Sequence, residues 1–260
     1  MALSNAGEMP FLDHLEELRW RLIWSIGAFI VGVAIAFTLL VKVDIILLMQ
    51  GPIAPFLHGK KLVYTHPGDP FQIVLNFSLA LGFILALPVI VWQVWSFLAP
   101  ALYLHEKKVV VPVLAGGIVL FLAGAALSWF FVLPLALEWL INFQSESLDP
   151  MITAGEYFGF VISMTLAFGA SFELPIVILL LSMLGIVNPR MLMKFRRHAV
   201  VGATIVGAFL TPGDLVWTTI LMAVPLYGLY ELSIILSWMV YRKKARKAAL
   251  EAAADEEAPA

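Results

Sequence analysis

Residues 71–97 read FQIVLNFSLALGFILALPVIVWQVWSF, a stretch of 27 residues that contains no Asp, Glu, Lys or Arg. A helix of about 20 apolar residues crosses a hydrocarbon core roughly 30 Å thick, so this segment is long enough to span a membrane. Over the whole chain, 62% of residues are hydrophobic and 13% are charged, and the mean hydropathy is +0.95. These values exclude a soluble domain, and with it the disordered, collagen-like and nucleic-acid-binding classes.

The apolar pattern of the chain predicts an all-α integral membrane protein with six spans in a single membrane domain, residues 1–240. The expected spans are about 20–41, 71–97, 109–143, 157–184, 199–210 and 215–240. The last two are separated by Thr211-Pro212-Gly213-Asp214, a strong turn signal. Residues 241–260 form a basic and then acidic tail, which we expect to begin helical and to be largely disordered.

The positions of Lys and Arg predict how the chain crosses the membrane. If the N-terminus lies in the cytoplasm, thirteen of these residues fall in cytoplasmic segments and three fall in outer loops. This asymmetry matches the positive-inside rule, so both termini are expected in the cytoplasm. The first 20 residues carry four acids and no small-residue cleavage site, so no cleavable signal peptide is expected.

Prolines inside the spans predict bent helices, because each removes a backbone donor. They are Pro88, Pro112, Pro134, Pro175 and Pro225. We expect a kinked, concave, cup-like bundle, although membrane helices also tolerate proline where neighbours satisfy the freed backbone groups. The predicted span 199–210 is only about 18 Å long. Either its hairpin is re-entrant, or the bilayer thins to meet it, or neighbouring helices bury it.

Glu17 lies in an amphipathic segment, residues 11–22, that leads into the first span. Asp13 and Glu16 lie beside it, and these acids contrast with the basic character of the other cytoplasmic segments. They could therefore receive a basic ligand. The alternative is a solvated face on which Glu17 pairs with Arg21 at spacing i,i+4, worth a few tenths of a kcal/mol.

Two further carboxylates are candidates. Glu106 precedes the third span, where it either caps a helix or supplies a second carboxylate on the same side as Glu17. Two spaced carboxylates suit two guanidinium groups, because Arg pairs with each through two parallel hydrogen bonds and Lys does not. Glu173 lies deep in the fourth span, where an ionisable group costs about 2.5–3.5 kcal/mol. One interpretation is that Glu173 has a function. The alternative is that Glu173 is protonated and donates a hydrogen bond to a backbone carbonyl that Pro175 leaves without a donor.

The sequence offers no set of catalytic or metal-binding residues. It contains no cysteine, no His-Glu-x-x-His motif and no Gly-rich phosphate loop, and its five histidines are scattered. We therefore expect no enzyme activity, metal or cofactor. A rival hypothesis is a proton-coupled small-solute transporter that uses Glu173. Such a protein needs several polar groups at one depth, and spans two to four offer few beyond Asn76, Gln93 and Ser171.

Four ordered blocks of the sequence resemble the TatC family, the multispanning subunits of the twin-arginine protein translocase. They are FLDHLEELRWRL (residues 11–22), SFLAPALYLHEKK (96–108), AFGASFELP (167–175) and LTPGD (210–214). The resemblance covers about residues 10–240. It implies six spans in a glove-like concave fold.

The resemblance implies that Glu17 and Glu106 bind the paired arginines of a signal peptide, with Arg19 supporting the same surface. The adjacent Glu16 is a competing candidate, although the spacing to Leu18 and Arg19 favours Glu17.

The resemblance also implies roles for two other acidic residues. Glu173 is expected to contact TatA- and TatB-type single-span subunits, and Asp214 matches an acidic position in the outer turn. The implied function is a receptor and core subunit, assembled as a multimer in the bacterial cytoplasmic membrane. It exports folded proteins and draws energy from the proton-motive force.

Overall fold

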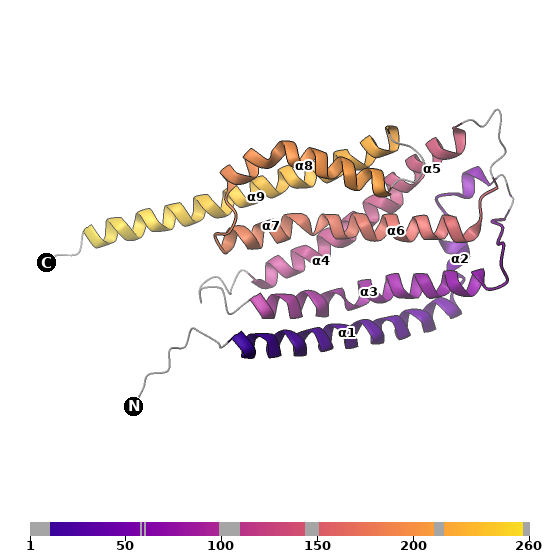
Figure 1. Ribbon diagram of the computed structural model, residues 1–260, viewed down its shortest axis with the longest axis horizontal. Helices are drawn as coiled ribbons and strands as arrows, with labels where there is room; N and C mark the ends of the chain where they lie inside the picture. Colours follow the sequence, from indigo (N-terminus) through magenta and orange to yellow (C-terminus); the bar gives the residue numbers. More distant parts are fainter. Residues whose placement is uncertain are drawn as a thin grey trace. The chain divides into compact units, whose positions relative to one another are not determined.

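Long helices make up the chain, as its apolar pattern predicts (Figure 1). The computed structural model describes residues 11–57, 59, 61–98, 110–143, 151–210 and 216–256. Within these ranges, the isolated bridge between Val63 and Thr153 is the sole β pairing. The all-α class is therefore confirmed.

Five helical segments of the described chain are long and apolar enough to cross a membrane. They are His14–Lys42, Asp69–Phe97, Val113–Asn142, Ala154–Met183 and Thr219–Lys243. Large apolar side chains such as Trp24, Ile30 and Phe130 are more than 60% exposed on these segments. Such exposure is unfavourable in water and favourable in lipid, so these surfaces are built to face a bilayer.

The chain divides into two compact units. One comprises the chain as far as Ile46 together with Pro70–Ile118, and the other comprises Leu47–Asp69 and Val119–Ala260. The first contains helix α1 (Phe11–Lys42), helix α3 (Asp69–Leu98) and the start of helix α4 (Val110–Leu127).

Helices α1 and α3 lie side by side in the first unit and run in opposite directions (Figure 1). They meet closely at Gly32 and Gly82, where a Cβ atom added to Gly32 would lie 2.5 Å from the carbonyl oxygen of Gly82. Near one end of the pair, the rings of Phe37 and Phe71 meet edge to face, 6.3 Å apart. Small residues let helix backbones approach in a membrane, where dispersion contacts replace the hydrophobic effect.

The second unit begins with the segment Leu47–Asp69, which contains the end of α2 (Ile45–Leu48) and the 3-10 turn η1 (Ala54–Phe56). The Tyr157 hydroxyl donates to the carbonyl oxygen of Met49 at 2.9 Å, and the Ala154 amide donates to that of Val63 at 2.7 Å. These bonds hold the segment against the start of helix α6 (Ala154–Phe172).

Two of the expected prolines coincide with breaks in regular α-helix. Between α4 and helix α5 (Leu133–Asn142), residues Ser128–Val132 form a π-turn just before Pro134. A π-turn accommodates a residue whose ring would clash in a regular helix. Pro175 begins helix α7 (Leu174–Met183) directly after α6. By contrast, α3 continues through Pro88, and the last helix continues through Pro225.

Helices α8 (Pro189–Leu210) and α9 (Trp217–Glu256) pack against each other, and α9 also packs against α7. The contact between α7 and α9 contains a buried hydrogen bond from the Ser182 hydroxyl to that of Ser237 at 2.7 Å. Both side chains are buried, so each hydroxyl gains a partner that its burial would otherwise deny it.

Helix α8 starts ten residues earlier than the expected span 199–210. The side chain of Asn188 accepts a hydrogen bond from the Met191 amide at 2.8 Å, and Pro189 opens the helix. Asn before Pro is a helix start signal, so the sequence did contain this information. The added turns carry Arg190, Lys194, Arg196 and Arg197. The helix is therefore long, while its uncharged part from residue 199 remains short.

Helix α9 also differs from expectation, because it is continuous to Glu256. We expected residues 241–260 to be largely disordered. Ala, Lys, Arg and Glu dominate this segment, and all four have high helix propensity. The segment also continues a helix that has already been nucleated, so each added residue gains a hydrogen bond without the cost of a new start.

The contact between Gly32 and Gly82 generates a stability prediction. The Gly32→Ala variant places a methyl group against the backbone of α3, which cannot move aside as a side chain can. We expect it to lower the free energy of unfolding by about 1–3 kcal/mol, measured as a lower melting temperature of the detergent-solubilised protein.

Gly27→Ala is the matched control on the same helix, because a Cβ at Gly27 meets no atom within 4 Å. Equal melting temperatures for the two variants would show that the close approach of α1 and α3 does not limit stability.

Candidate functional site

Glu17 lies on the face of α1 that turns toward α3. Its Oε1 atom accepts two hydrogen bonds from Arg21, one from Nε at 2.9 Å and one from Nη2. Arg21 also donates through Nη1 to Oε1 of Gln93 on α3 at 3.3 Å. The side chains of Glu17 and Arg21 are 21% and 25% exposed, so the pair is half-buried. The i,i+4 pairing that the sequence left as an alternative is therefore present, and it extends to a second helix.

The second carboxylate oxygen of Glu17 has a different environment. Oε2 is buried and has no hydrogen-bond partner among the described residues. Nδ1 of His14 lies 3.8 Å from Oε2, which is beyond hydrogen-bond distance. The His14 ring stacks on Phe97 with centroids 4.3 Å apart and an interplanar angle of 15°. The Glu17 carboxylate thus has one oxygen that accepts two hydrogen bonds and one buried oxygen without a partner, one helical turn from the His14–Phe97 stack.

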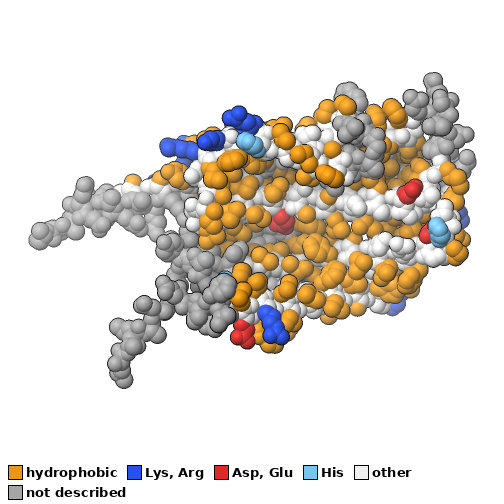
Figure 2. All heavy atoms as spheres, in the orientation of Figure 1, with side chains coloured by type: hydrophobic (Ala, Val, Ile, Leu, Met, Phe, Trp, Pro, Cys, Tyr) orange, Lys and Arg blue, Asp and Glu red, His pale blue; other side chains and the backbone are white. Residues whose placement is uncertain are grey.

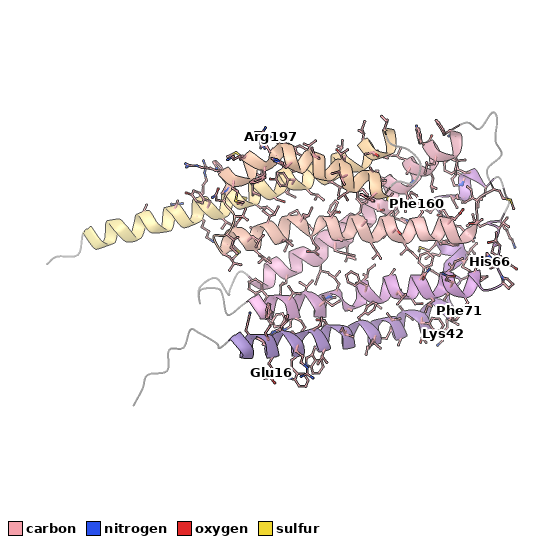
Figure 3. All side chains as sticks on the ribbon, in the orientation of Figure 1. Glu16, Lys42, His66, Phe71, Phe160 and Arg197 are labelled. Carbon is pink, nitrogen blue, oxygen red and sulfur yellow. The ribbon has the colours of Figure 1, made fainter. Side chains whose placement is uncertain are left out.

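The structure separates Glu17 from its neighbour Glu16. Glu16 is exposed and projects from α1 on the side away from α3 (Figure 3). Arg19 is also exposed, and its position two residues after Glu17 places it on the opposite side of the helix. Glu17 is therefore the carboxylate of this segment that joins the cluster with Arg21 and Gln93, while Arg19 lies outside that cluster.

Two other predicted site residues, Glu106 and Asp214, lie outside the described residues.

Glu173 lies at the junction of α6 and α7, where it ends one helix and begins the next. Its amide donates to the carbonyl of Ala170 at 3.1 Å, and Pro175 follows in the first turn of α7. The side chain is half-buried, and its Oε1 atom is buried without a hydrogen-bond partner in the described part of the chain. A carboxyl group with an open position inside a membrane segment is suited to a polar partner from another helix.

A third polar cluster joins α8 to α9, and sequence reasoning missed it. Glu231 accepts hydrogen bonds from Nη2 of Arg196 at 2.7 Å and from the Tyr227 hydroxyl at 2.6 Å. Tyr230 adds a bond to the carbonyl of Leu192 at 2.8 Å. The spacing of Tyr227 and Glu231 at i,i+4 was a usable signal. The Arg196 contact depended on the register of two helices, which the sequence does not state.

The first half of α8 is strongly basic. Figure 2 shows Lys and Arg side chains gathered over this helix, and Arg197 projects outward from it in Figure 3. Within the described residues, Arg196 is the one cation of α8 that forms an ion pair, with Glu231. In those same described ranges, no three His, Asp or Glu residues come together as a metal site would require.

Comparison with known proteins identifies the family. The family model named Sec-independent protein translocase protein (TatC) matches residues 13–225. The chain belongs to the TatC family. The TatC protein of Aquifex aeolicus is 43% identical over 238 residues, which are 91% of this chain and 98% of that relative. The TatC protein of Escherichia coli K12 is 38% identical over 238 residues, which are 90% of each chain.

A solved TatC structure agrees with these sequence matches. It is described as a crystal structure of the twin arginine translocase receptor TatC, and it aligns with a TM-score of 0.77 and 41% sequence identity. The alignment covers 88% of this chain and 99% of that one. The resemblance inferred from the four blocks is therefore confirmed, and the chain is a multi-pass membrane component of a protein translocase.

The different environments of Glu16 and Glu17 can be measured by thiol labelling, because the natural chain contains no cysteine. In this TatC protein we expect Glu16→Cys to react with a water-soluble maleimide faster than Glu17→Cys. The first position is exposed, whereas the second faces α3 and is half-buried. Equal labelling rates in membrane vesicles would contradict the orientation of α1 described above.

Proposed function

We propose that this TatC protein is the receptor and core subunit of a twin-arginine translocase. In this role it binds twin-arginine signal peptides and exports folded proteins across the bacterial cytoplasmic membrane with energy from the proton-motive force. The observation that carries the proposal is the Oε2 atom of Glu17, which has no hydrogen-bond partner among the described residues. This carboxylate lies in a chain of which 88% aligns with a twin arginine translocase receptor. The family matches support this function over the small-solute transporter.

The signal-binding site in this proposal consists of Glu17 and Glu106, with Arg19 supporting the surface. A guanidinium group can bind a carboxylate through two parallel hydrogen bonds, whereas a lysine ammonium acts as a point charge. Two separate carboxylates would therefore select paired arginines.

Glu173 has a separate role in the proposal, which is to contact TatA- and TatB-type single-span subunits. Support comes from its position in a membrane span and from its unpartnered Oε1 atom. A hydrogen bond between helices in a membrane is worth about 0.6–2 kcal/mol. Asp214, in the outer turn, is a further polar position of this assembly, which we expect to contain several receptor units.

The proposed orientation places both termini in the cytoplasm and the loops 42–70, 143–154 and 211–216 outside. Its support is the excess of Lys and Arg on one side of the predicted spans. This orientation brings the start of α1 and the basic half of α8 to the cytoplasmic surface. A concave bundle is the shape that we expect for these spans.

Photo-crosslinking tests the receptor role directly. With crosslinkers next to Glu17 and Glu106 in the full-length protein, we expect an Arg-Arg signal peptide to crosslink and a Lys-Lys peptide to crosslink weakly. Glu17→Gln and Glu106→Gln each remove a negative charge and should each abolish most Arg-Arg crosslinking.

Glu16→Gln is the matched control for these substitutions, because it removes an equal charge from the exposed side of α1. Crosslinking that ignores the choice between Arg and Lys, or that persists in both variants, would refute the signal-binding role of these carboxylates.

Co-purification tests the partner role of Glu173. We expect Glu173→Ala to leave Arg-Arg peptide binding intact and to reduce recovery of the single-span subunits several-fold, as loss of about 1 kcal/mol implies. Glu138→Ala is the control, since Glu138 is an exposed acid in another membrane span. Undiminished recovery of partners with Glu173→Ala would remove this residue from the proposed contact.

A further inference from the structure

The hydrogen bonds of Glu17 limit how a ligand can reach it. Both donors from Arg21, Nε and Nη2, converge on the same oxygen, Oε1. A guanidinium that binds a carboxylate through two parallel bonds requires both oxygens. In the structure, Oε2 is buried and has no hydrogen-bond partner among the described residues, and Oε1 already accepts both bonds from Arg21. A second arginine therefore binds Glu17 in the two-bond geometry only after Arg21 has released Oε1.

We infer that Arg21 is an intramolecular competitor that occupies the arginine site of Glu17 until a signal arginine replaces it. This inference rests on the proposed function, because it concerns the affinity of the same site for guanidinium. The exchange replaces one guanidinium by another, so the hydrogen bonds to Glu17 are conserved. Arg21 thereby sets the affinity of the receptor, and it ensures that the Glu17 carboxylate is never left without a partner.

Gln93 makes the exchange feasible. Its Oε1 atom already accepts a hydrogen bond from Nη1 of Arg21 at 3.3 Å. After release from Glu17, Arg21 keeps this acceptor on α3, and its Nε and Nη2 donors turn to water, since the side chain is 25% exposed. His14 must also move, because its Nδ1 atom lies 3.8 Å from Oε2. His14 is 43% exposed, so its ring has free space into which it can turn.

The competition acts differently on arginine and lysine ligands. A lysine ammonium forms single contacts and can bind Oε2 while Arg21 retains Oε1. An arginine that binds both oxygens of Glu17 must displace Arg21, whereas a lysine need not. Removal of Arg21 therefore strengthens binding of arginine more than binding of lysine. Loss of a positive charge by itself would strengthen both to a similar degree.

The test measures dissociation constants of fluorescent Arg-Arg and Lys-Lys signal peptides for the full-length protein in lipid nanodiscs. We expect Arg21→Gln to bind the Arg-Arg peptide about three- to tenfold more tightly, as release from a half-buried pair implies. The gain for the Lys-Lys peptide should be smaller, so the ratio of the two affinities rises. Arg197→Gln controls for loss of one exposed cation elsewhere on the chain.

Two outcomes would overturn the inference. Weaker or unchanged binding of the Arg-Arg peptide to Arg21→Gln would show that Arg21 supports the site and does not compete for it. Equal gains for both peptides would show that only net charge matters. Gel filtration and the melting temperature of each variant establish that the protein tested is folded.

A double-mutant cycle tests the role of Gln93 independently. We expect Gln93→Leu to weaken Arg-Arg binding when Arg21 is present, because the bond to Gln93 is long while Arg21 holds Glu17, at 3.3 Å, and becomes the main side-chain contact of the displaced guanidinium. The same substitution should have no effect in the Arg21→Gln background. An equal loss in both backgrounds would mean that Gln93 contacts the peptide itself, and it would refute the proposed exchange.

Glu17→Gln separates failure of this inference from failure of the proposed function. If Glu17→Gln binds the Arg-Arg peptide as the natural protein does, Glu17 does not bind the signal. In that case Arg21 cannot compete with the signal for Glu17, and both proposals fail. If Glu17→Gln loses binding but Arg21→Gln shows no gain, the receptor role stands and the inference about Arg21 is refuted.

Discussion

The absence of water from the bilayer core governs this protein, because every polar group within it must find a partner inside the chain. Helices satisfy the backbone, and the Ser182–Ser237 hydrogen bond satisfies two hydroxyls between α7 and α9. The described membrane segments also contain exceptions: Oε1 of Glu173 and the hydroxyls of Ser128 and Thr165 are buried without a hydrogen-bond partner. Glu17, near the start of α1, has an unpartnered Oε2 atom as well. To the two carboxyl groups, Glu17 and Glu173, we assign a signal and a partner subunit.

The class of fold and most helix positions could be predicted from the sequence, because long apolar runs have few alternatives in a membrane protein. The start of α8 could not be placed from hydropathy, since Arg190 to Arg197 interrupt the apolar pattern within one continuous helix. The helical end of α9 was also missed, because its charged composition is shared by disordered tails and by exposed helices.

The candidate site was predicted in part. Glu17 was named both as a ligand residue and as the partner of Arg21, and the pairing is present. The sequence could not indicate that both Arg21 donors meet one oxygen, or that Gln93 shares Arg21, because these facts depend on rotamers and on the register of α1 and α3. The Arg196–Glu231 contact was missed for the same reason, as it joins residues 35 positions apart.

The continuity of α9 has a practical consequence for anyone who attaches a reporter to this protein. The helix continues for thirteen residues beyond Lys243, where the last membrane segment ends, and it ends at Glu256. At 1.5 Å per residue they form a rod about 20 Å long. A fluorescent domain fused there would be carried by a rigid stalk, so its distance from the bilayer would report the tilt of α9 rather than the freedom of a flexible tether.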